Sequence, residues 1–176
     1  MNLRNYTLFL DRDGVINKQK KNGYIESVSE FEFLPRVLDI FPLLNNYFST
    51  ILIVTNQQGV GKGLMTIEQL DEIHRHMCRE IEKKGGKIHK VYYCPHLAST
   101  APLCRKPNTG MAIEAKKDFP QIEFSKSVMV GDSESDVEFA LNLGMPAVRI
   151  LNGLNEVQTA ADFSFANLAE FAKNLR

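Results

Sequence analysis

The sequence has no excess of charge of either sign and no long apolar run, and each of these absences argues against a class of protein. Lys and Arg together number 21 and so do Asp and Glu, which gives a formal net charge of zero. Without a broad basic surface, we expect no nucleic-acid partner. No apolar run approaches the ~18 residues that cross a bilayer, and residues 1–11 do not follow a signal-peptide pattern. We therefore expect a cytoplasmic protein with no membrane partner.

Cysteine is also scarce, and nothing in the sequence divides the chain. Three cysteines, an odd number, are not the pattern of a disulfide framework. The 176 residues, 44% of them hydrophobic, suffice for one sizeable core, and no repeat, low-complexity tract or linker interrupts them. We expect one domain over residues 1–176, and a monomer.

Segments of strand and helix character alternate along the chain, which predicts an α/β fold. Short apolar runs predict five strands, at residues 6–10, 51–55, 90–94, 127–131 and 146–150. Apolar residues at helical spacing predict helices at residues 34–46, 66–84, 110–119, 134–143 and 167–175. Every connection is long enough for parallel pairing, so we expect a three-layer, doubly wound parallel sheet.

Two helices have recognisable local signals. Pro35 suits the first position of the 34–46 helix, and Pro42 is expected to kink or split that helix. Thr66 and Gln69 have the spacing of a capping box at the start of the 66–84 helix. Its core-facing stripe is predicted to consist of Ile67, Leu70, Ile73, Met77 and Ile81.

Polar side chains follow several of the predicted strands, where parallel sheets bind their ligands. These residues are Asp11, Asp13, Thr55, Asn56, Lys106 and Asp132. Asp11 and Asp13 are two residues apart, so they are expected to project to the same side, with Arg12 pointing away. Crowded carboxylates repel one another unless a cation compensates them. Magnesium, held by Asp11, the Asp13 main-chain carbonyl and Asp132, is the simplest explanation.

The order of these motifs resembles that of the haloacid dehalogenase superfamily of phosphatases. The first strand is followed by Asp-Arg-Asp-Gly, the second ends in Thr, a Lys-Pro pair comes later, and Gly-Asp-x-x-x-Asp follows the fourth strand. The resemblance implies that Asp11 is the nucleophile and Asp13 the general acid and base, with Thr55 and Lys106 stabilising the phosphoryl group. The last motif would supply a magnesium ligand and a supporting carboxylate, Asp132 and Asp136.

The resemblance extends over nearly the whole chain to the D-glycero-D-manno-heptose 1,7-bisphosphate 7-phosphatases and their near relatives, the histidinol-phosphatases. Its segments include Gly23-Tyr24-Ile25, Thr55-Asn-Gln-Gln-Gly59, Tyr92-Tyr-Cys-Pro-His96 and Cys104-Arg-Lys-Pro107. That family makes activated heptose for lipopolysaccharide or surface glycans, and its members lack a large cap domain. The resemblance implies a small-molecule sugar phosphate as the substrate, contacted by Asn22, Gly23, Tyr24, Asn56, Gln57 and Arg105. We assign the distal phosphate to Arg105, whose fork matches phosphate oxygens in pairs.

The loop from Cys94 to Cys104 departs from the family pattern. The family holds this loop with zinc on Cys-x-His and Cys-x-Cys, whereas here Pro102 replaces one ligand and leaves Cys94, His96 and Cys104. Such a site would take water or His89 as its fourth ligand, bind zinc weakly, or stay empty with the loop held by packing. A Cys94–Cys104 disulfide is a further alternative, disfavoured in a reducing cytoplasm.

Other functions remain as alternatives. Histidinol phosphate is the alternative substrate, because the Cys94–Cys104 loop is as short as expected on that branch. A phosphate-binding domain without turnover and a nucleic-acid 3′-phosphatase are less favoured, given the complete motif set and the neutral charge. The glycines between residues 59 and 63 lack the spacing of an ATP-binding loop. His74, His76 and His89 are interpreted as ordinary helix and loop positions.

Overall fold

The computed structural model describes residues 4–154 and 157–175. Its centre is a six-stranded sheet in the order β3-β2-β1-β4-β5-β6, with every neighbouring pair parallel. The strands are β1 (Thr7–Leu10), β2 (Thr50–Asn56), β3 (Lys90–Cys94), β4 (Ser127–Gly131), β5 (Ala147–Ile150) and β6 (Phe163–Phe165). The predicted doubly wound parallel sheet is confirmed, and five of its strands lie where the sequence places them.

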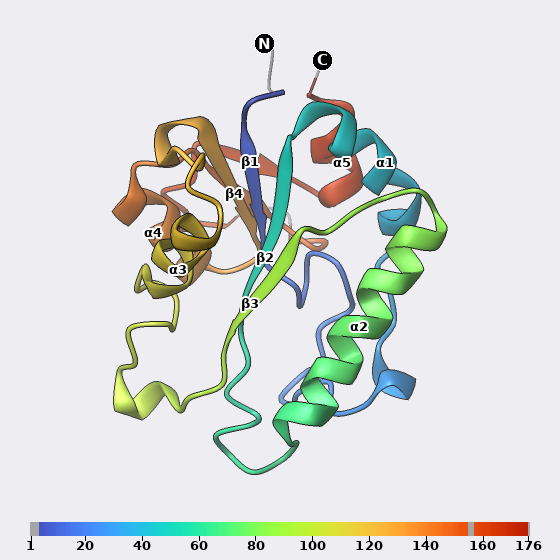
Figure 1. The fold of residues 1–176 in the computed structure, drawn as a ribbon, viewed down its shortest axis with the longest axis vertical. Helices are drawn as coiled ribbons and strands as arrows, with labels where there is room; N and C mark the ends of the chain where they lie inside the picture. Colours follow the sequence, from blue (N-terminus) through green and yellow to red (C-terminus); the bar gives the residue numbers. More distant parts are fainter. Residues whose placement is uncertain (1–3, 155–156, 176) are drawn as a thin grey trace.

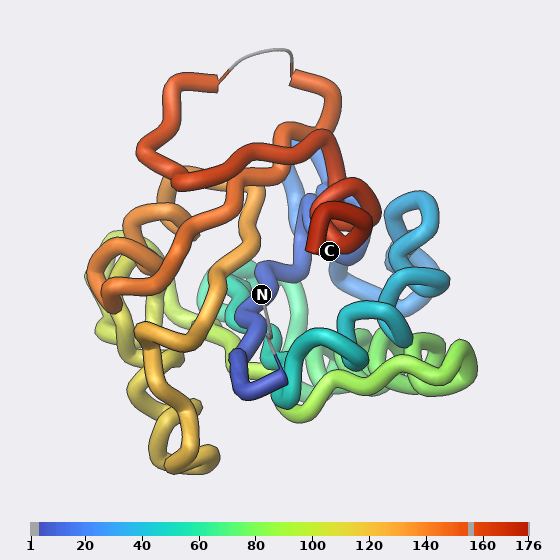
Figure 2. Tube along the Cα trace, turned by 90° about the horizontal axis from the view of Figure 1, so that it is seen from above, coloured from blue at the N-terminus to red at the C-terminus, as the bar shows by residue number. Residues whose placement is uncertain are grey.

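Helices cover both faces of the sheet, which gives three layers (Figures 1 and 2). One face packs against α1 (Val37–Tyr47), α2 (Ile67–Lys83) and α5 (Leu168–Lys173), and the other against α3 (Gly110–Asp118) and α4 (Glu134–Leu143). Strand alternation explains this division, because Leu8 and Leu10 belong to the first core while Phe9 belongs to the second. Three short 3-10 helices, η1 (Val28–Glu30), η2 (Ala98–Thr100) and η3 (Phe124–Lys126), lie in the connections.

The start of α1 differs from the prediction. The helix begins at Val37, because Arg36 before it adopts a left-handed conformation with φ 67°. Pro35 therefore lies outside the helix, and its assignment to the first helical position is wrong. Pro42 lies inside α1, yet the helix continues to Tyr47. We attribute this continuity to tertiary packing, since one face of α1 is buried.

The start of α2 is the predicted capping box. The Thr66 side chain accepts from the Gln69 amide at 3.2 Å, and the Gln69 side chain accepts from the Thr66 amide at 2.8 Å. Ile67 is 45% exposed, so its assignment to the core is wrong. In the first turn of α2, Leu70 is fully buried, whereas Ile67 lies on the exposed side of the helix. The buried stripe instead includes His74, which the sequence interpretation left as an ordinary position.

The sheet brings the carboxyl ends of β1, β2 and β4 side by side, and the polar motifs follow these ends. Ligands of open parallel sheets bind beyond such ends. Over the described ranges, no helix has both the length and the apolar composition needed to cross a membrane.

Candidate active site

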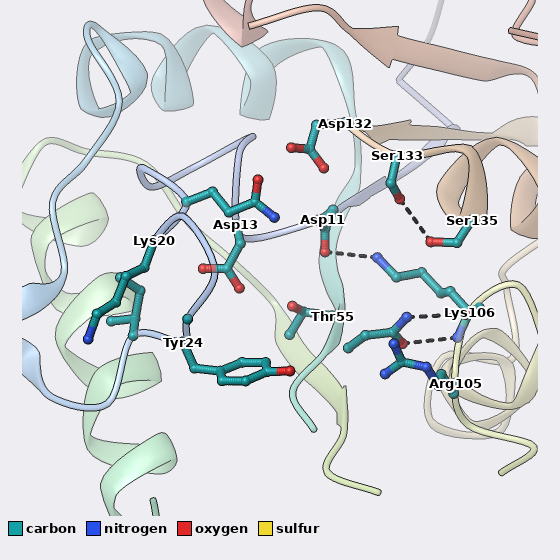
Figure 3. Close-up of a pocket in the computed structure, with 14 residues that line it drawn as sticks. Asp11, Asp13, Lys20, Tyr24, Thr55, Arg105, Lys106, Asp132, Ser133 and Ser135 are labelled. Carbon is teal, nitrogen blue, oxygen red and sulfur yellow. Dashed lines mark hydrogen bonds and ion pairs between the residues drawn. The ribbon is translucent and has the colours of Figure 1, made fainter. Parts of the chain in front are cut away.

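A pocket of about 210 Å³ opens at the carboxyl ends of β1, β2 and β4 (Figure 3). It is lined by Asp11, Asp13, Gln19, Lys20, Gly23, Tyr24, Ile25, Thr55, Asn56, Arg105, Lys106, Asp132, Ser133 and Ser135. At Gly14, the turn after β1 lies so close to Asp132 that an added Cβ atom would be 1.9 Å from the Asp132 Oδ2 atom. Gly14 also has φ +79°, so both its conformation and its space require glycine.

Lys106 is buried beneath the pocket and uses all three of its ammonium donors. Its Nζ atom donates to Asp11 at 2.8 Å, to Asp136 at 2.5 Å and to the Val54 carbonyl at 2.7 Å. Burial alone would lower the pKa of Lys106, but the two carboxylates outweigh it and raise that pKa. Lys106 is therefore a fixed positive charge beside the expected nucleophile.

The backbone of Lys106 is held as firmly as its side chain. Asn56 accepts from the Lys106 amide at 3.0 Å and donates to the Lys106 carbonyl at 3.1 Å. The next peptide bond, Lys106–Pro107, is cis. Asn56, expected to contact substrate, thus also fixes the lysine in place.

Three carboxylates meet at the side of the pocket formed by β1 and the β4–α4 connection. Asp11, Asp132 and Asp136 each offer an oxygen, and these oxygens lie within 4.8 Å of one another. Burial, with the neighbouring carboxylates, raises the pKa of Asp11 to about 7 against the opposing effect of Lys106. Burial and Asp136 raise the pKa of Asp132 to about 6. A hard divalent cation, which prefers oxygen ligands, fits this donor set and would relieve the repulsion.

Asp136 has a second role in this cluster. Its Oδ2 atom accepts from the Ser133 amide at 3.0 Å and from the Ser133 hydroxyl at 2.7 Å, which caps the start of α4. Its Oδ1 atom accepts a hydrogen bond from the Lys106 ammonium group. Both oxygens therefore already have protein partners, and we assign Asp136 chiefly to supporting Lys106.

Asp13 faces the same pocket but is bound by a different set of groups. Its carboxylate accepts two bonds from Arg12 at 3.0 Å, one from Asn17 at 2.9 Å and one from Gln57 at 2.7 Å. Burial would raise the pKa of Asp13, but Arg12 and these hydrogen bonds lower it overall. Asp11 and Asp13 line the pocket and Arg12 does not, as the spacing predicts, but the fully buried Arg12 side chain also pairs with Asp13, which was not predicted.

The residues expected to contact substrate divide into two groups. Gly23, Tyr24, Asn56 and Arg105 line the pocket, as does Thr55. Asn22 and Gln57 do not line this pocket. Asn22 is exposed with φ 57°, and Gln57 is buried, donating to Asp13 and, at 3.0 Å, to Thr55.

Arg105 and Tyr24 lie on the two loops that border the pocket. The Arg105 Nη1 atom is buried and has no hydrogen-bond partner in the part of the chain that the structure describes. Gln58 joins the two loops, since it donates to the Tyr24 hydroxyl at 2.8 Å and accepts from the Ala98 amide at 3.1 Å. The opening is thus bordered by tethered short loops.

Sequence reasoning missed several pocket residues. Lys20, Ser133 and Ser135 line the pocket and were not predicted. The serines lie between the aspartates of the Gly-Asp-x-x-x-Asp motif, at the start of a helix, and this position could have indicated them. Lys20 lies in a polar loop without a distinguishing pattern.

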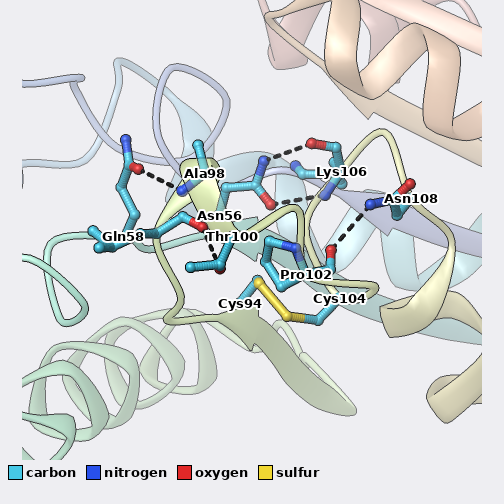
Figure 4. Close-up of a disulfide and its surroundings, with 10 residues drawn as sticks. Asn56, Gln58, Cys94, Ala98, Thr100, Pro102, Cys104, Lys106 and Asn108 are labelled. Carbon is cyan, nitrogen blue, oxygen red and sulfur yellow. Dashed lines mark hydrogen bonds between the residues drawn. A yellow bond between two sulfur atoms is a disulfide. The ribbon is translucent and has the colours of Figure 1, made fainter.

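In the loop from Cys94 to Cys104, the two cysteines form a disulfide (Figure 4). This is the alternative that the redox argument disfavours, and here the geometry of the loop brings the two sulfurs together. A disulfide sulfur is not a thiolate, so neither cysteine can bind zinc in this state. The His96 side chain is exposed. Zinc binding by the reduced loop stays a prediction.

Comparison with known proteins identifies the family of this chain. A family model described as HAD-hydrolase-like matches residues 103–176. The chain is 39% identical over 170 residues to a D-glycero-alpha-D-manno-heptose-1,7-bisphosphate 7-phosphatase of Mycobacterium bovis, covering 95% of this chain and 90% of the relative. It is 35% identical over 172 residues to the protein of that name from Campylobacter jejuni, covering 96% and 94%.

A solved structure gives the same result. The D,D-heptose 1,7-bisphosphate phosphatase of B. bronchiseptica, complexed with magnesium and phosphate, superposes with a TM-score of 0.84 at 27% identity and 97% coverage of both chains. Sequence relatives and fold therefore indicate the same family. The chain belongs to the heptose 1,7-bisphosphate 7-phosphatase family of haloacid dehalogenase-like phosphatases, which are phosphoric monoester hydrolases.

Proposed function

We propose that this protein removes the C7 phosphate of D-glycero-D-manno-heptose 1,7-bisphosphate and releases heptose 1-phosphate and inorganic phosphate. The observation that supports it most is that Asp11 pairs with buried Lys106 at 2.8 Å beside further carboxylates. In the same pocket, the Arg105 Nη1 atom has no hydrogen-bond partner among residues 4–154 and 157–175. The named substrate of the relatives has two phosphates. Of the three positive side chains in the pocket lining, Lys20, Arg105 and Lys106, we assign Lys106 to the transferred phosphate and Arg105 to the distal one.

The first half of the reaction is nucleophilic displacement on phosphorus. A carboxylate oxygen of Asp11 forms a bond to phosphorus, and the bond between phosphorus and the C7 oxygen breaks. Asp13 supplies a proton to that oxygen, which leaves as the sugar hydroxyl. A bound phosphate places negative charge near Asp13, which raises a carboxyl pKa and favours the protonated form that this step needs.

The second half hydrolyses the aspartyl phosphate. Water attacks phosphorus, Asp13 accepts its proton, and Asp11 is released as a carboxylate. The Arg12, Asn17 and Gln57 bonds favour ionised Asp13, which suits this role as a base. Lys106 and Thr55 line the pocket, and in this proposal they stabilise the negative charge on the transferred phosphoryl group.

We infer that Asp11 and Asp132, with the Asp13 main-chain carbonyl, hold a magnesium ion, and that Asp136 supports them. When bound, magnesium supplies positive charge that keeps these carboxylates ionised and offsets the charge of the phosphoryl oxygens. We retain the cytoplasm as the expected setting and a monomer as the expected state.

The test compares substrates and follows the product. Purified protein is assayed, with and without magnesium, on both anomers of heptose 1,7-bisphosphate and on histidinol phosphate, and phosphorus NMR identifies the phosphate removed. We expect magnesium-dependent loss of the C7 signal with the C1 signal retained. A higher kcat/KM for histidinol phosphate, or loss of the C1 phosphate first, would contradict the proposal.

A further inference from the structure

A series of hydrogen-bonded, buried side chains connects helix α2 with the pocket. His74 lies in the middle of α2 with 5% of its surface exposed, and its Nε2 atom is 3.1 Å from the Arg12 Nη1 atom. A guanidinium group can only donate, so Nε2 accepts and the ring proton is on Nδ1. The Tyr93 ring lies beside the imidazole at 5.5 Å between centroids.

Arg12 joins this histidine to the pocket. Its Nη2 atom donates to both oxygens of Asp13 at 3.0 Å, while its Nε atom has no partner among the residues described. The side chain itself is fully buried. His74 and Asp13 are thus the side chains that fix the plane of the guanidinium group.

His74 is suited to be a constant acceptor. Burial, with the neighbouring Arg12 charge, lowers the pKa of His74 to about 3. The charged groups that act on it are Arg12 and, with the opposite effect, Asp13. The imidazole therefore stays neutral across the pH range in which enzymes are assayed, and the contact to Arg12 persists.

We propose that His74 is a positioning residue that orients Asp13 for proton transfer through Arg12. The inference rests on the proposed function, in which Asp13 protonates the leaving oxygen. A residue on a helix that covers one face of the sheet would then set the geometry of the general acid through an arginine 62 positions away along the chain. Losing the acceptor would remove one of the two side chains that fix the guanidinium group, and Asp13 would be oriented less firmly, by Asn17 and Gln57 and by a less restrained Arg12.

The alternative is that His74 merely satisfies a buried arginine. When His74 is replaced, the two roles predict different decreases in kcat/KM for substrates with good and poor leaving groups. A sugar hydroxyl is a poor leaving group that needs the proton from Asp13, whereas p-nitrophenolate leaves without one. Because kcat/KM covers the steps up to departure of the leaving group, a positioning defect lowers it more for the sugar phosphate, and a purely structural defect lowers both equally.

The experiment measures kcat/KM for heptose 1,7-bisphosphate and for p-nitrophenyl phosphate in four variants. We expect His74→Leu to lose about tenfold or more on the sugar phosphate relative to the aryl phosphate. His74→Gln, which can present an oxygen near the Nε2 position, should regain most of that difference. The matched control is His76→Gln. His76 is on the same helix as His74, and its ring packs against Phe31 with 5.9 Å between centroids. This variant should leave both kcat/KM values unchanged.

The fourth variant, Asp13→Asn, separates the two proposals. If it shows no preference for the aryl phosphate, the assigned role of Asp13 fails, and the proposed function must be revised. Asp13→Asn can instead prefer the aryl phosphate while His74→Leu loses activity equally on both substrates or loses none. That result overturns only the inference on His74. Should the leucine protein fail to fold, His74→Asn, which is too short to reach Arg12, is measured under the same criteria.

Discussion

At the scale of the residue, Arg105 offers the sharpest test of substrate choice. Its Nη1 atom is buried beside the pocket and has no hydrogen-bond partner within the described part of the chain, which is costly unless a ligand accepts a hydrogen bond from it. Arg105→Met should raise KM for the bisphosphate by about 10- to 100-fold and change kcat little, because a distal phosphate is bound equally in the ground and transition states. A sugar monophosphate serves as the control. An equal rise in KM for the monophosphate would show that Arg105 does not bind the distal group.

The sequence motifs predicted which residues form the site, but not which side chains hold those residues in place. Asp11 and Asp132 could be placed at one site because each directly follows a strand of a parallel sheet. Lys106 lies in the long connection between β3 and α3, and its assignment depended on the Lys-Pro motif of the family resemblance. The bond from Arg12 to His74 joins residues 62 positions apart through particular side-chain conformations, and strand alternation did not predict that Arg12 would also pair with Asp13. A period-two rule holds only where the strand continues, and β1 ends at Leu10.

At the scale of the element, the α2 capping box tests how much local sequence contributes to stability. Thr66→Ala removes the acceptor for the Gln69 amide and should lower the free energy of unfolding by about 1 kcal/mol. Chemical denaturation measures the change, with Thr66→Ser as the conservative control. Loss from the serine variant as large as that from alanine would show that packing of Thr66, and not the cap, is responsible.

The Cys94–Cys104 disulfide gives a second prediction at this scale. With the disulfide formed, the denatured protein should contain one titratable thiol, that of Cys78, and no zinc by elemental analysis. Three thiols together with one bound zinc per chain would show instead that the loop is a metal site. Sequence alone could not separate these outcomes, because the same cysteine spacing suits both.

The strands also show what local sequence leaves undetermined. β6 has three residues at the edge of the sheet, two of them exposed, and so lacks the apolar run by which the other strands were predicted. Its pairing with β5 is set by the tertiary fold. The longer buried strands carried their own signal, since residues covered on both faces form continuous apolar runs.

At the scale of the whole molecule, the acidic cluster couples folding to pH and metal. The pKa values of Asp11 and Asp132, raised to about 7 and about 6, lie above their ordinary value, so the metal-free folded state binds more protons than the unfolded state. The stability that these groups contribute is therefore present near pH 4 and is lost as pH rises to about 7. Magnesium binds the ionised form, so its stabilising effect should grow over the same range.

Thermal unfolding measures this coupling. Saturating magnesium should raise Tm by roughly 5–10 °C at about pH 8 and by much less at about pH 5. Asp132→Asn should abolish the difference and, by removing a repelling charge, should not destabilise the metal-free protein at the higher pH. An equal effect of magnesium at both pH values would contradict the coupling.

The most direct test of the whole account is whether Asp11 takes up the phosphoryl group. Enzyme mixed with heptose 1,7-bisphosphate and magnesium is quenched rapidly in acid, digested and analysed by mass spectrometry. We predict one phosphoryl group, sensitive to hydroxylamine, on the peptide that contains Asp11, and we predict that Asp11→Asn lowers kcat by about a thousandfold or more. An Asp11→Asn protein that releases phosphate at the normal rate would contradict the account.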